Sequence, residues 1–164
     1  MSTAKEKELK QRGDAIKKSL GSDRLIKFTH FLCSEYDPIA VIAEYIFATP
    51  CLDVVPSGVL KIIDTIDMFP MKKAQVIKHG VEDLLHCTRR EERDYLLKSD
   101  AILAIQSEEA KMFQKLVPER EVLTISIDYD VGDEIDNSSV VPAVILVAGS
   151  DNPLNIHGLG EFLQ

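Results

Sequence analysis

The feature that most constrains this chain is a set of five short, continuous apolar runs. The runs are AVIAEY (40–45), VLKIID (59–64), AILAIQ (101–106), VLTISI (122–127) and VILVAG (144–149). A strand with one solvated face alternates apolar and polar residues, whereas a parallel strand buried on both faces is apolar throughout. The runs therefore predict a parallel sheet with both faces covered.

Helical segments separate several of these runs. Residues 4–20 read as a highly charged helix, and residues 24–34 continue as a helix with a stronger apolar face. Pro38 ends this second helix, because the residue before a proline avoids the helical region. Alternating strands and helices form right-handed β-α-β units. The predicted fold is α/β, with a Rossmann-like parallel sheet and flanking helices.

Two helix starts carry recognisable chemistry. Thr88 and Glu91 have the spacing of a capping box at the start of RREERDYLLK. Ser107 can cap the following helix, SEEAKMFQKLV, with two glutamates in its first turn. Both helices are therefore expected to begin at these residues.

Charge is unevenly distributed along the chain. Residues 1–27 hold eight Lys/Arg against four Asp/Glu, a balance of +4, so the rest must carry −12 to give the net −8. Phosphate binding needs a basic surface, so this acidic body argues against nucleic acid as the main partner. The basic N-terminus suits either peripheral contact with an anionic membrane or a solvated helix face, and we favour the solvated face.

The sequence also predicts a location. No apolar run approaches the roughly 18 residues that span a bilayer, and MSTAKEKELKQRG lacks the apolar core of a secretion signal. The three cysteines are an odd number without CxxC spacing, which is typical of reduced thiols. We therefore expect a cytoplasmic protein. The cysteines are Cys33, Cys51 and Cys87.

Familiar ligand-binding signatures are missing. The sequence has no GxGxxG after a strand, no GxxxxGK[ST], no GxSxG and no HExxH. The acidic stretch from Asp128 to Ser139 fails the calcium-loop pattern, because its twelfth position is serine instead of glutamate. We interpret that stretch as a linker, and expect no cofactor and no metal site.

The most informative local element is IIDTIDMF (62–69), where an apolar run ends with Asp64 and Asp67. Ligands of open parallel sheets collect at the carboxyl ends of strands. Two carboxylates there could position an acceptor hydroxyl or accept its proton. Alternatively, Asp64 caps the following turn and Asp67 is simply exposed.

Three blocks in order carry a family resemblance. Residues 36–69 (YDPIAVIAEYIFATPCLDVVPSGVLKIIDTIDMF) and 90–125 (REERDYLLKSDAILAIQSEEAKMFQKLVPEREVLTI) resemble the acceptor-side domain of GT-B-type glycosyltransferases, more narrowly family four, group one. Residues 144–163 (VILVAGSDNPLNIHGLGEFL) are similar to the opening of the donor-binding domain. The resemblance divides the chain into an N-terminal helical segment (1–35), an acceptor-side domain (36–138) and a stub of the donor domain (142–164).

The resemblance implies two Rossmann-like domains facing each other across a cleft. It implies transfer of a sugar from a nucleotide-diphosphate sugar to a hydroxyl acceptor, with retention of configuration and usually without a metal. Asp64 and Asp67 would lie on the acceptor side. Gly149, Ser150, Asn152 and Asn155 would lie near the donor phosphates, although Asn152-Pro153 equally suits a plain turn.

Two departures from the family bear on activity. The family commonly has Asp-Thr-His-Asp where this chain has Ile66 in place of the histidine, and most of the donor domain is not visible. We therefore expect a glycosyltransferase-like fragment in a truncated GT-B architecture, inactive alone. The alternative is a non-enzymatic interaction protein or a subunit of a split enzyme. The apolar strand within 143–164 could also support self-association.

Overall fold

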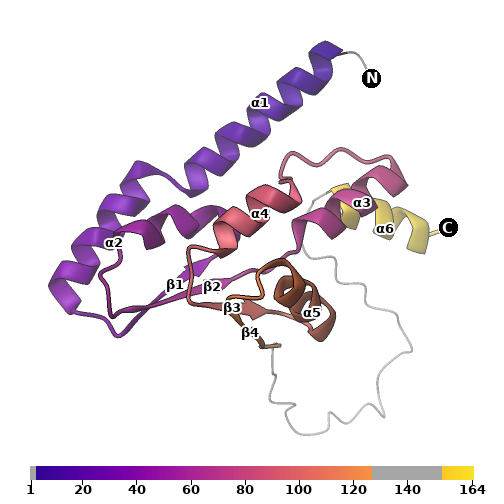
Figure 1. Ribbon diagram of the computed structural model, residues 1–164. Coiled ribbons are helices and arrows are strands. Elements are labelled where there is room, and N and C mark those ends of the chain that lie inside the picture. The colour runs from indigo at the N-terminus through magenta and orange to yellow at the C-terminus, as the bar shows by residue number, and fades with distance from the viewer. Residues whose placement is uncertain (1–2, 127–152) are drawn as a thin grey trace, which may run out of the picture.

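A computed structural model describes residues 3–126 and 153–164 of the chain (Figure 1). The linker interpretation for 128–139, the run at 144–149, and the candidate residues Gly149, Ser150 and Asn152 lie outside the described residues. The division into three segments accordingly stays a prediction.

The described elements alternate between helix and strand after two N-terminal helices. Their bounds are α1 Thr3–Leu20, α2 Asp23–Tyr36, β1 Ala40–Glu44, the 3-10 helix η1 Ile46–Val54, β2 Leu60–Asp64, α3 Phe69–His79, α4 Arg89–Leu96, β3 Ala101–Ala104, α5 Ser107–Leu116, β4 Glu121–Thr124 and α6 Pro153–Phe162. Four of the five predicted strands therefore form within the described residues.

The strands form one parallel sheet in the order β1-β2-β3-β4 (Figure 1). In register, Ile63 lies between Ala43 on β1 and Ile102 on β3. This sheet with its flanking helices confirms the predicted α/β, Rossmann-like fold.

Helices cover one face of the sheet and enclose the core there. The inward residues Ile63, Ile102 and Ala104 are almost completely buried, as are the helical side chains packed against them. Those helical residues include Phe47 and Leu52 of η1, Leu96 of α4, and Phe113 and Leu116 of α5.

The opposite face of the sheet exposes apolar side chains. Ile42 is 59% exposed, Leu60 is 46% exposed and Leu123 is 42% exposed. The prediction that both faces are covered is therefore wrong for the described part of the chain. A sheet whose strands follow one another in order places every right-handed crossover on the same side, so these connections leave the other side open.

The N-terminal helices make close backbone contacts with η1 and with the loop before α4. A Cβ on Gly13 of α1 would lie 2.2 Å from the carbonyl oxygen of Leu84, and one on Gly21 would lie 2.7 Å from the carbonyl oxygen of Phe47. Helix α2 packs against η1 and adds Cys33 to the core. A side chain at either position would clash with backbone, at Gly13 with the loop before α4 and at Gly21 with η1, so glycine is needed at both.

Helix α2 ends where the sequence predicts. Its C-cap, Asp37, precedes Pro38 and adopts the left-handed conformation with φ 45°. Aspartate tolerates this conformation better than most residues, because its short polar side chain can bond locally. None of the described helices is long and apolar enough to traverse a lipid bilayer.

One predicted helix cap is confirmed and the other is wrong. The Thr88 hydroxyl accepts from the Glu91 N–H at 3.2 Å, and the Glu91 carboxylate accepts from the Thr88 N–H at 2.7 Å, a complete capping box. Helix α5 instead has Gln106 at its N-cap, without a side-chain capping bond. Ser107 lies inside the helix and donates to the Glu108 carboxylate at 3.0 Å.

Candidate functional site

The candidate site lies where β2 ends and the chain turns into α3. Thr65, directly after β2, is fully buried, and both its backbone N–H and its hydroxyl donate to the carbonyl of Leu103 on β3, at 3.2 and 2.9 Å. The threonine therefore fixes the end of the strand against its neighbour, and whatever follows it starts from a rigid point.

A tight turn follows at Ile66. The Asp67 N–H donates to the Thr65 carbonyl at 2.6 Å, which closes a three-residue γ-turn around Ile66. Ile66 has φ 58°, a left-handed conformation that is strained for a β-branched residue. The turn places Asp67 beside Lys72 of α3.

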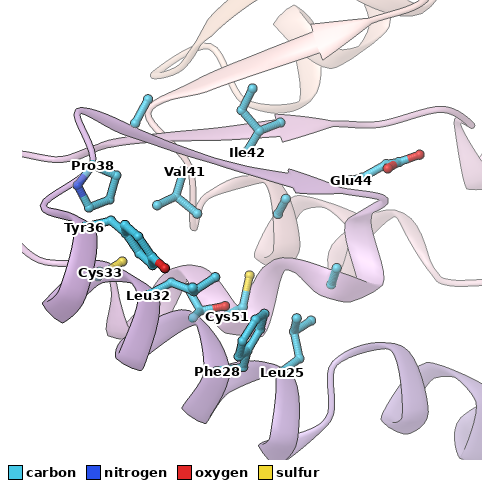
Figure 2. Close-up of a pocket in the computed structure, with 14 residues that line it drawn as sticks. Leu25, Phe28, Leu32, Cys33, Tyr36, Pro38, Val41, Ile42, Glu44 and Cys51 are labelled. Atoms are coloured by element: carbon cyan, nitrogen blue, oxygen red, sulfur yellow. The ribbon is translucent and has the colours of Figure 1, made fainter.

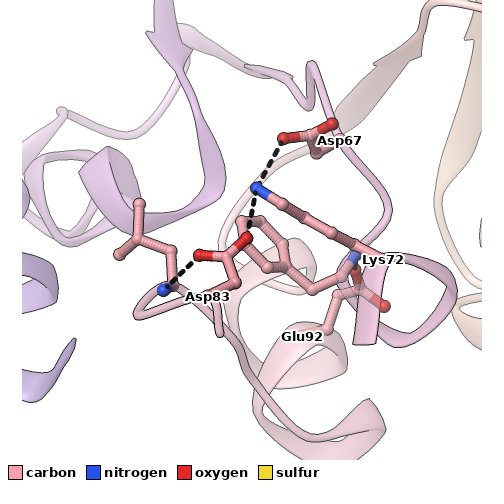
Figure 3. Close-up of polar contacts among 6 residues, drawn as sticks. Asp67, Lys72, Asp83 and Glu92 are labelled. Carbon is pink, nitrogen blue, oxygen red and sulfur yellow. Dashed lines mark hydrogen bonds and ion pairs between the residues drawn. The ribbon is translucent and has the colours of Figure 1, made fainter. Parts of the chain in front are cut away.

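Asp67 belongs to a chain of charges that also includes Lys72 and Asp83 (Figure 3). The Lys72 ammonium lies 3.4 Å from the Asp67 carboxylate and 3.2 Å from the Asp83 carboxylate. The Lys72 side chain is only 17% exposed, and its ammonium also lies 5.5 Å from the centre of the Phe69 ring. Asp83 is held in turn by the Leu85 N–H at 2.9 Å. This lysine therefore bridges two carboxylates at the edge of the core.

Two buried glutamates, one on α4 and one on α5, interact with the backbone at the start of α3. Glu92 of α4 is fully buried, and its Oε1 accepts from the Phe69 N–H at 2.9 Å, whereas its Oε2 has no hydrogen-bond partner among the described residues. Burial raises the pKa of Glu92 to about 7, although the bond from Phe69 acts in the opposite direction. Burial also raises the pKa of Glu109 on α5, and the nearby charge of Asp67 adds to this effect.

Tyr45, just after β1, completes the site. Its ring contacts Phe47 and Phe69, with centroids 5.4 and 5.6 Å away. Burial raises the pKa of Tyr45, and the negative charges of Asp67 and Asp83 raise it further. The phenol therefore stays protonated and can donate a hydrogen bond.

The structure separates the two predicted acceptor-side aspartates. Asp64 is the last residue of β2 and pairs in register with Glu44 of β1, so its side chain lies on the open face of the sheet. Asp67 lies beyond the turn, beside Lys72. No hydrogen bond joins the two among the described residues. Asn155, predicted near the donor phosphates, lies on α6, which packs against α3.

The turn and its charges define what the site can do chemically. The Asp67 side chain is 43% exposed, so its carboxylate can accept a hydrogen bond from an incoming hydroxyl. Lys72 holds that carboxylate in place and balances its charge. The arrangement suits orientation of a hydroxyl group and acceptance of its proton.

Sequence reasoning did not identify Tyr45, Lys72, Asp83 or the two buried glutamates. A signal exists for the glutamates. Glu92 precedes Leu96 by four residues, and Glu109 precedes Phe113 by four, so each lies on the apolar face of an amphipathic helix. A charged residue on an apolar helix face is rarely buried without a specific partner. The position of each glutamate in the sequence could therefore have indicated a buried polar contact.

A second feature is an apolar groove of about 600 Å³ between α2 and β1 (Figure 2). Phe28, Leu32 and Tyr36 of α2 line one wall, Val41 of β1 lines the other, and Cys51 of η1 lies at the base. Strand β1 is an edge strand that pairs only with β2 among the described strands. The groove is therefore an apolar surface beside an open sheet edge.

Comparison of the chain with protein-family models, with curated proteins and with solved structures finds no match in any of the three.

Proposed function

We propose that this chain provides the acceptor side of a GT-B-type glycosyltransferase, which transfers a sugar from a nucleotide-diphosphate sugar to a hydroxyl acceptor with retention of configuration. The observation that carries the proposal is the position of the Asp67 carboxylate. Its carboxylate follows the carboxyl end of a central parallel strand, is aimed by the turn at Ile66, and is held by Lys72. Ligands of parallel α/β sheets bind at this edge.

In this proposal the residues have distinct roles. Asp67 orients the acceptor hydroxyl and accepts its proton, and Lys72 holds Asp67 in position. The protonated Tyr45 donates a hydrogen bond to the acceptor. Asp64 lies on the open face of the sheet and has no direct role in the proposed transfer. We place the reaction in the cytoplasm, with neither metal nor cofactor.

The donor side needs residues beyond this site. Gly149, Ser150, Asn152 and Asn155 are our candidates for contact with the donor diphosphate, because loops at helix N-termini bind phosphate groups. Ile66 cannot replace the histidine of the family by hydrogen bonding. We therefore propose that transfer requires a complete donor-binding domain, supplied by a partner or by fusion.

The test is a fusion that places a complete donor-binding domain after Gln164, assayed against a panel of nucleotide sugars. We expect transfer by the fusion and none by the chain alone. Asp67→Asn should lower the transfer rate by about 10²- to 10⁴-fold, the usual contribution of a positioned proton acceptor. Asp94→Asn, at an exposed position of α4, is the matched control and should leave the rate unchanged.

The Ile66→His variant separates the two missing parts. In the chain alone it should not create activity, because the donor still lacks its site. In the fusion it should raise the rate, because an imidazole would then reach the reacting groups. Turnover by the unmodified chain, or equal rates for the Asp67→Asn and Asp94→Asn fusions, would contradict the proposal.

The alternative function is a non-enzymatic interaction protein or a subunit of a split enzyme, and the groove between α2 and β1 is the observation that favours it. Apolar grooves beside an open strand edge accept peptide segments. Loss of partner binding on a groove substitution such as Leu32→Asp, with full binding by Asp67→Asn, would favour this alternative. Among the basic residues of α1, Lys7 and Lys18 form no ion pair within the described residues and are our candidates for peripheral membrane contact, which vesicle sedimentation tests directly.

A further inference from the structure

Four residues on the outer side of α2 form what we call the α2 stripe: Arg24, Phe28, Phe31 and Glu35. Their spacing of four, three and four residues places them along one side of the helix. Phe28 is 56% exposed and Phe31 is 53% exposed, and the two charged residues are also exposed. Two aromatic rings are thus presented to solvent between charges of opposite sign.

The charges at the ends of the α2 stripe are unsatisfied. Neither Arg24 nor Glu35 takes part in an ion pair or a side-chain hydrogen bond within the described part of the chain. Arg93 and Lys98, in contrast, each pair with a carboxylate from another element. The stripe therefore offers one free cation and one free anion, about 11 residues of helix apart.

The α2 stripe is complementary to itself. Arg24 and Glu35 lie equally far from the middle of the stripe, as do Phe28 and Phe31. If two copies of α2 pack antiparallel about a twofold axis through that middle, Arg24 faces the partner's Glu35 and Phe28 faces the partner's Phe31. Such an isologous contact uses the same patch twice, which is the commonest symmetry of homo-oligomers.

We propose that the α2 stripe is a dimer interface, and that its occupant is the α2 helix of a second copy of this chain. Tyr36, 73% exposed, lies on the groove side of α2, and Ile39, 91% exposed, follows the helix, so neither is counted in the stripe. At roughly 100 Å² for each of the two exposed rings, and with the stems of the two charged side chains, each copy buries about 400 Å². That value is below the usual size of a specific interface, so the dimer should be weak and concentration-dependent.

The charge pattern selects this occupant over an anionic membrane. A membrane-binding face needs cations along its length, whereas the α2 stripe ends in the carboxylate of Glu35. The pairing also covers the mouth of the groove between α2 and β1, because Phe28 belongs both to the stripe and to the groove wall (Figure 2). The proposal is independent of sugar transfer.

The test is charge reversal on the full chain, with the dimer dissociation constant measured by sedimentation equilibrium over a wide concentration range. Arg24→Glu and Glu35→Arg should each weaken the dimer by at least about tenfold, because each places like charges opposite one another. The double variant Arg24→Glu with Glu35→Arg restores opposite charges and should recover most of the affinity. Lys111→Glu, on the exposed side of α5, is the matched control.

These reversals should leave the fold intact. Arg24→Glu adds an anion to the first turn of α2 and Glu35→Arg adds a cation to its last turn, and both changes agree with the helix dipole. Circular dichroism should therefore be unchanged. As a second variant, Phe28→Ser should abolish the dimer, whereas Ile77→Ser on α3, where the isoleucine is 69% exposed, should not.

Three results would overturn the proposal. The first is a chain that stays monomeric at every concentration. The second is a double reversal that fails to recover the affinity lost in the single variants. The third is a dimer that persists in every α2 variant, which would instead favour association through residues 143–164. Loss of transfer activity in the donor-domain fusion has no bearing on any of these outcomes.

Discussion

The carboxylate of Glu92 on α4 accepts a hydrogen bond from the backbone N–H of Phe69 at the start of α3, 2.9 Å away. This bond joins two helices through residues that are 23 positions apart in sequence. It satisfies one of the N–H groups that every helix leaves without a partner at its N-terminus. The bond therefore positions the turn that presents Asp67.

Glu92 should make stability depend on pH. Its pKa is about 7 in the folded chain and near 4.5 when unfolded, so between these values the folded chain holds more protons. The free energy of unfolding should therefore fall as pH rises from about 4.5 to about 7, by roughly 3 kcal/mol at most, and level off above. Urea unfolding at a series of pH values measures this.

Glu92→Gln should remove much of that slope. The amide carbonyl can still accept from Phe69, and no charge is buried at high pH. We expect this variant to be at least as stable as the natural chain at pH 8, with a residual slope from Glu109, whose pKa is also raised. Glu121→Gln on the exposed edge of β4 is the control. Parallel pH curves for the natural chain and Glu92→Gln would show that Glu92 is not the titrating group.

Gly13→Ala should loosen α1. Its new methyl group would lie 2.2 Å from the Leu84 carbonyl oxygen, so helix and loop must separate, and this outweighs the gain of about 1 kcal/mol in helix propensity. Hydrogen exchange should then be faster across α1 and residues 81–87. Gly158→Ala on α6, where the new methyl group meets no atom from outside the local helix backbone within 4 Å, should instead slow exchange across α6. Equal behaviour of the two variants would refute the contact.

Thr88→Ala should destabilise the protein by about 1 kcal/mol, because it removes the hydroxyl that caps α4. Ser107→Ala should change stability by a few tenths of a kcal/mol only, since that hydroxyl bonds to the exposed side chain of Glu108 and caps nothing. Thermal unfolding of both variants compares them directly. A larger loss for Ser107→Ala than for Thr88→Ala would reverse our assignment of the caps.

Ile66→Asn should stabilise the chain by about 0.5–1 kcal/mol. A β-branched residue in the left-handed region costs about 1–2 kcal/mol, whereas asparagine tolerates it, and Ile66 is 37% exposed, so some apolar burial is lost. Ile77→Asn on α3 has no strain to relieve and should be slightly destabilising. If Ile66→Asn is the less stable of the two, the packing of Ile66 outweighs its strain.

The strands were predictable because each is a compact apolar run, and the Thr88 cap because its signal is local. Helix α3 was not predicted, because FPMKKAQVIKH has a weak apolar pattern and its N-cap, Met68, makes no side-chain capping bond that the sequence could signal. The 3-10 helix η1 contains Pro50 and is held by burial, which local sequence does not reveal.

The site was predictable only in part. Asp67 follows a strand end, and that position alone indicates it. Lys72 of α3 contacts Asp67, and Asp83 of the loop after α3 contacts Lys72, so this arrangement depends on tertiary structure. The φ of Ile66 could not be inferred, because nothing in an isoleucine signals a left-handed turn.

The order β1-β2-β3-β4 lets the sheet assemble in step with synthesis. Each new strand pairs with the one made before it, so no strand waits for a distant segment to leave the ribosome. The stretches between paired strands hold 15 residues (45–59), 36 residues (65–100) and 16 residues (105–120), so the pairing of β2 with β3 carries the largest entropy cost of closure. We therefore expect the first three strands to pair before β4, and α5, which contributes Phe113 and Leu116 to the core, to cover them afterwards.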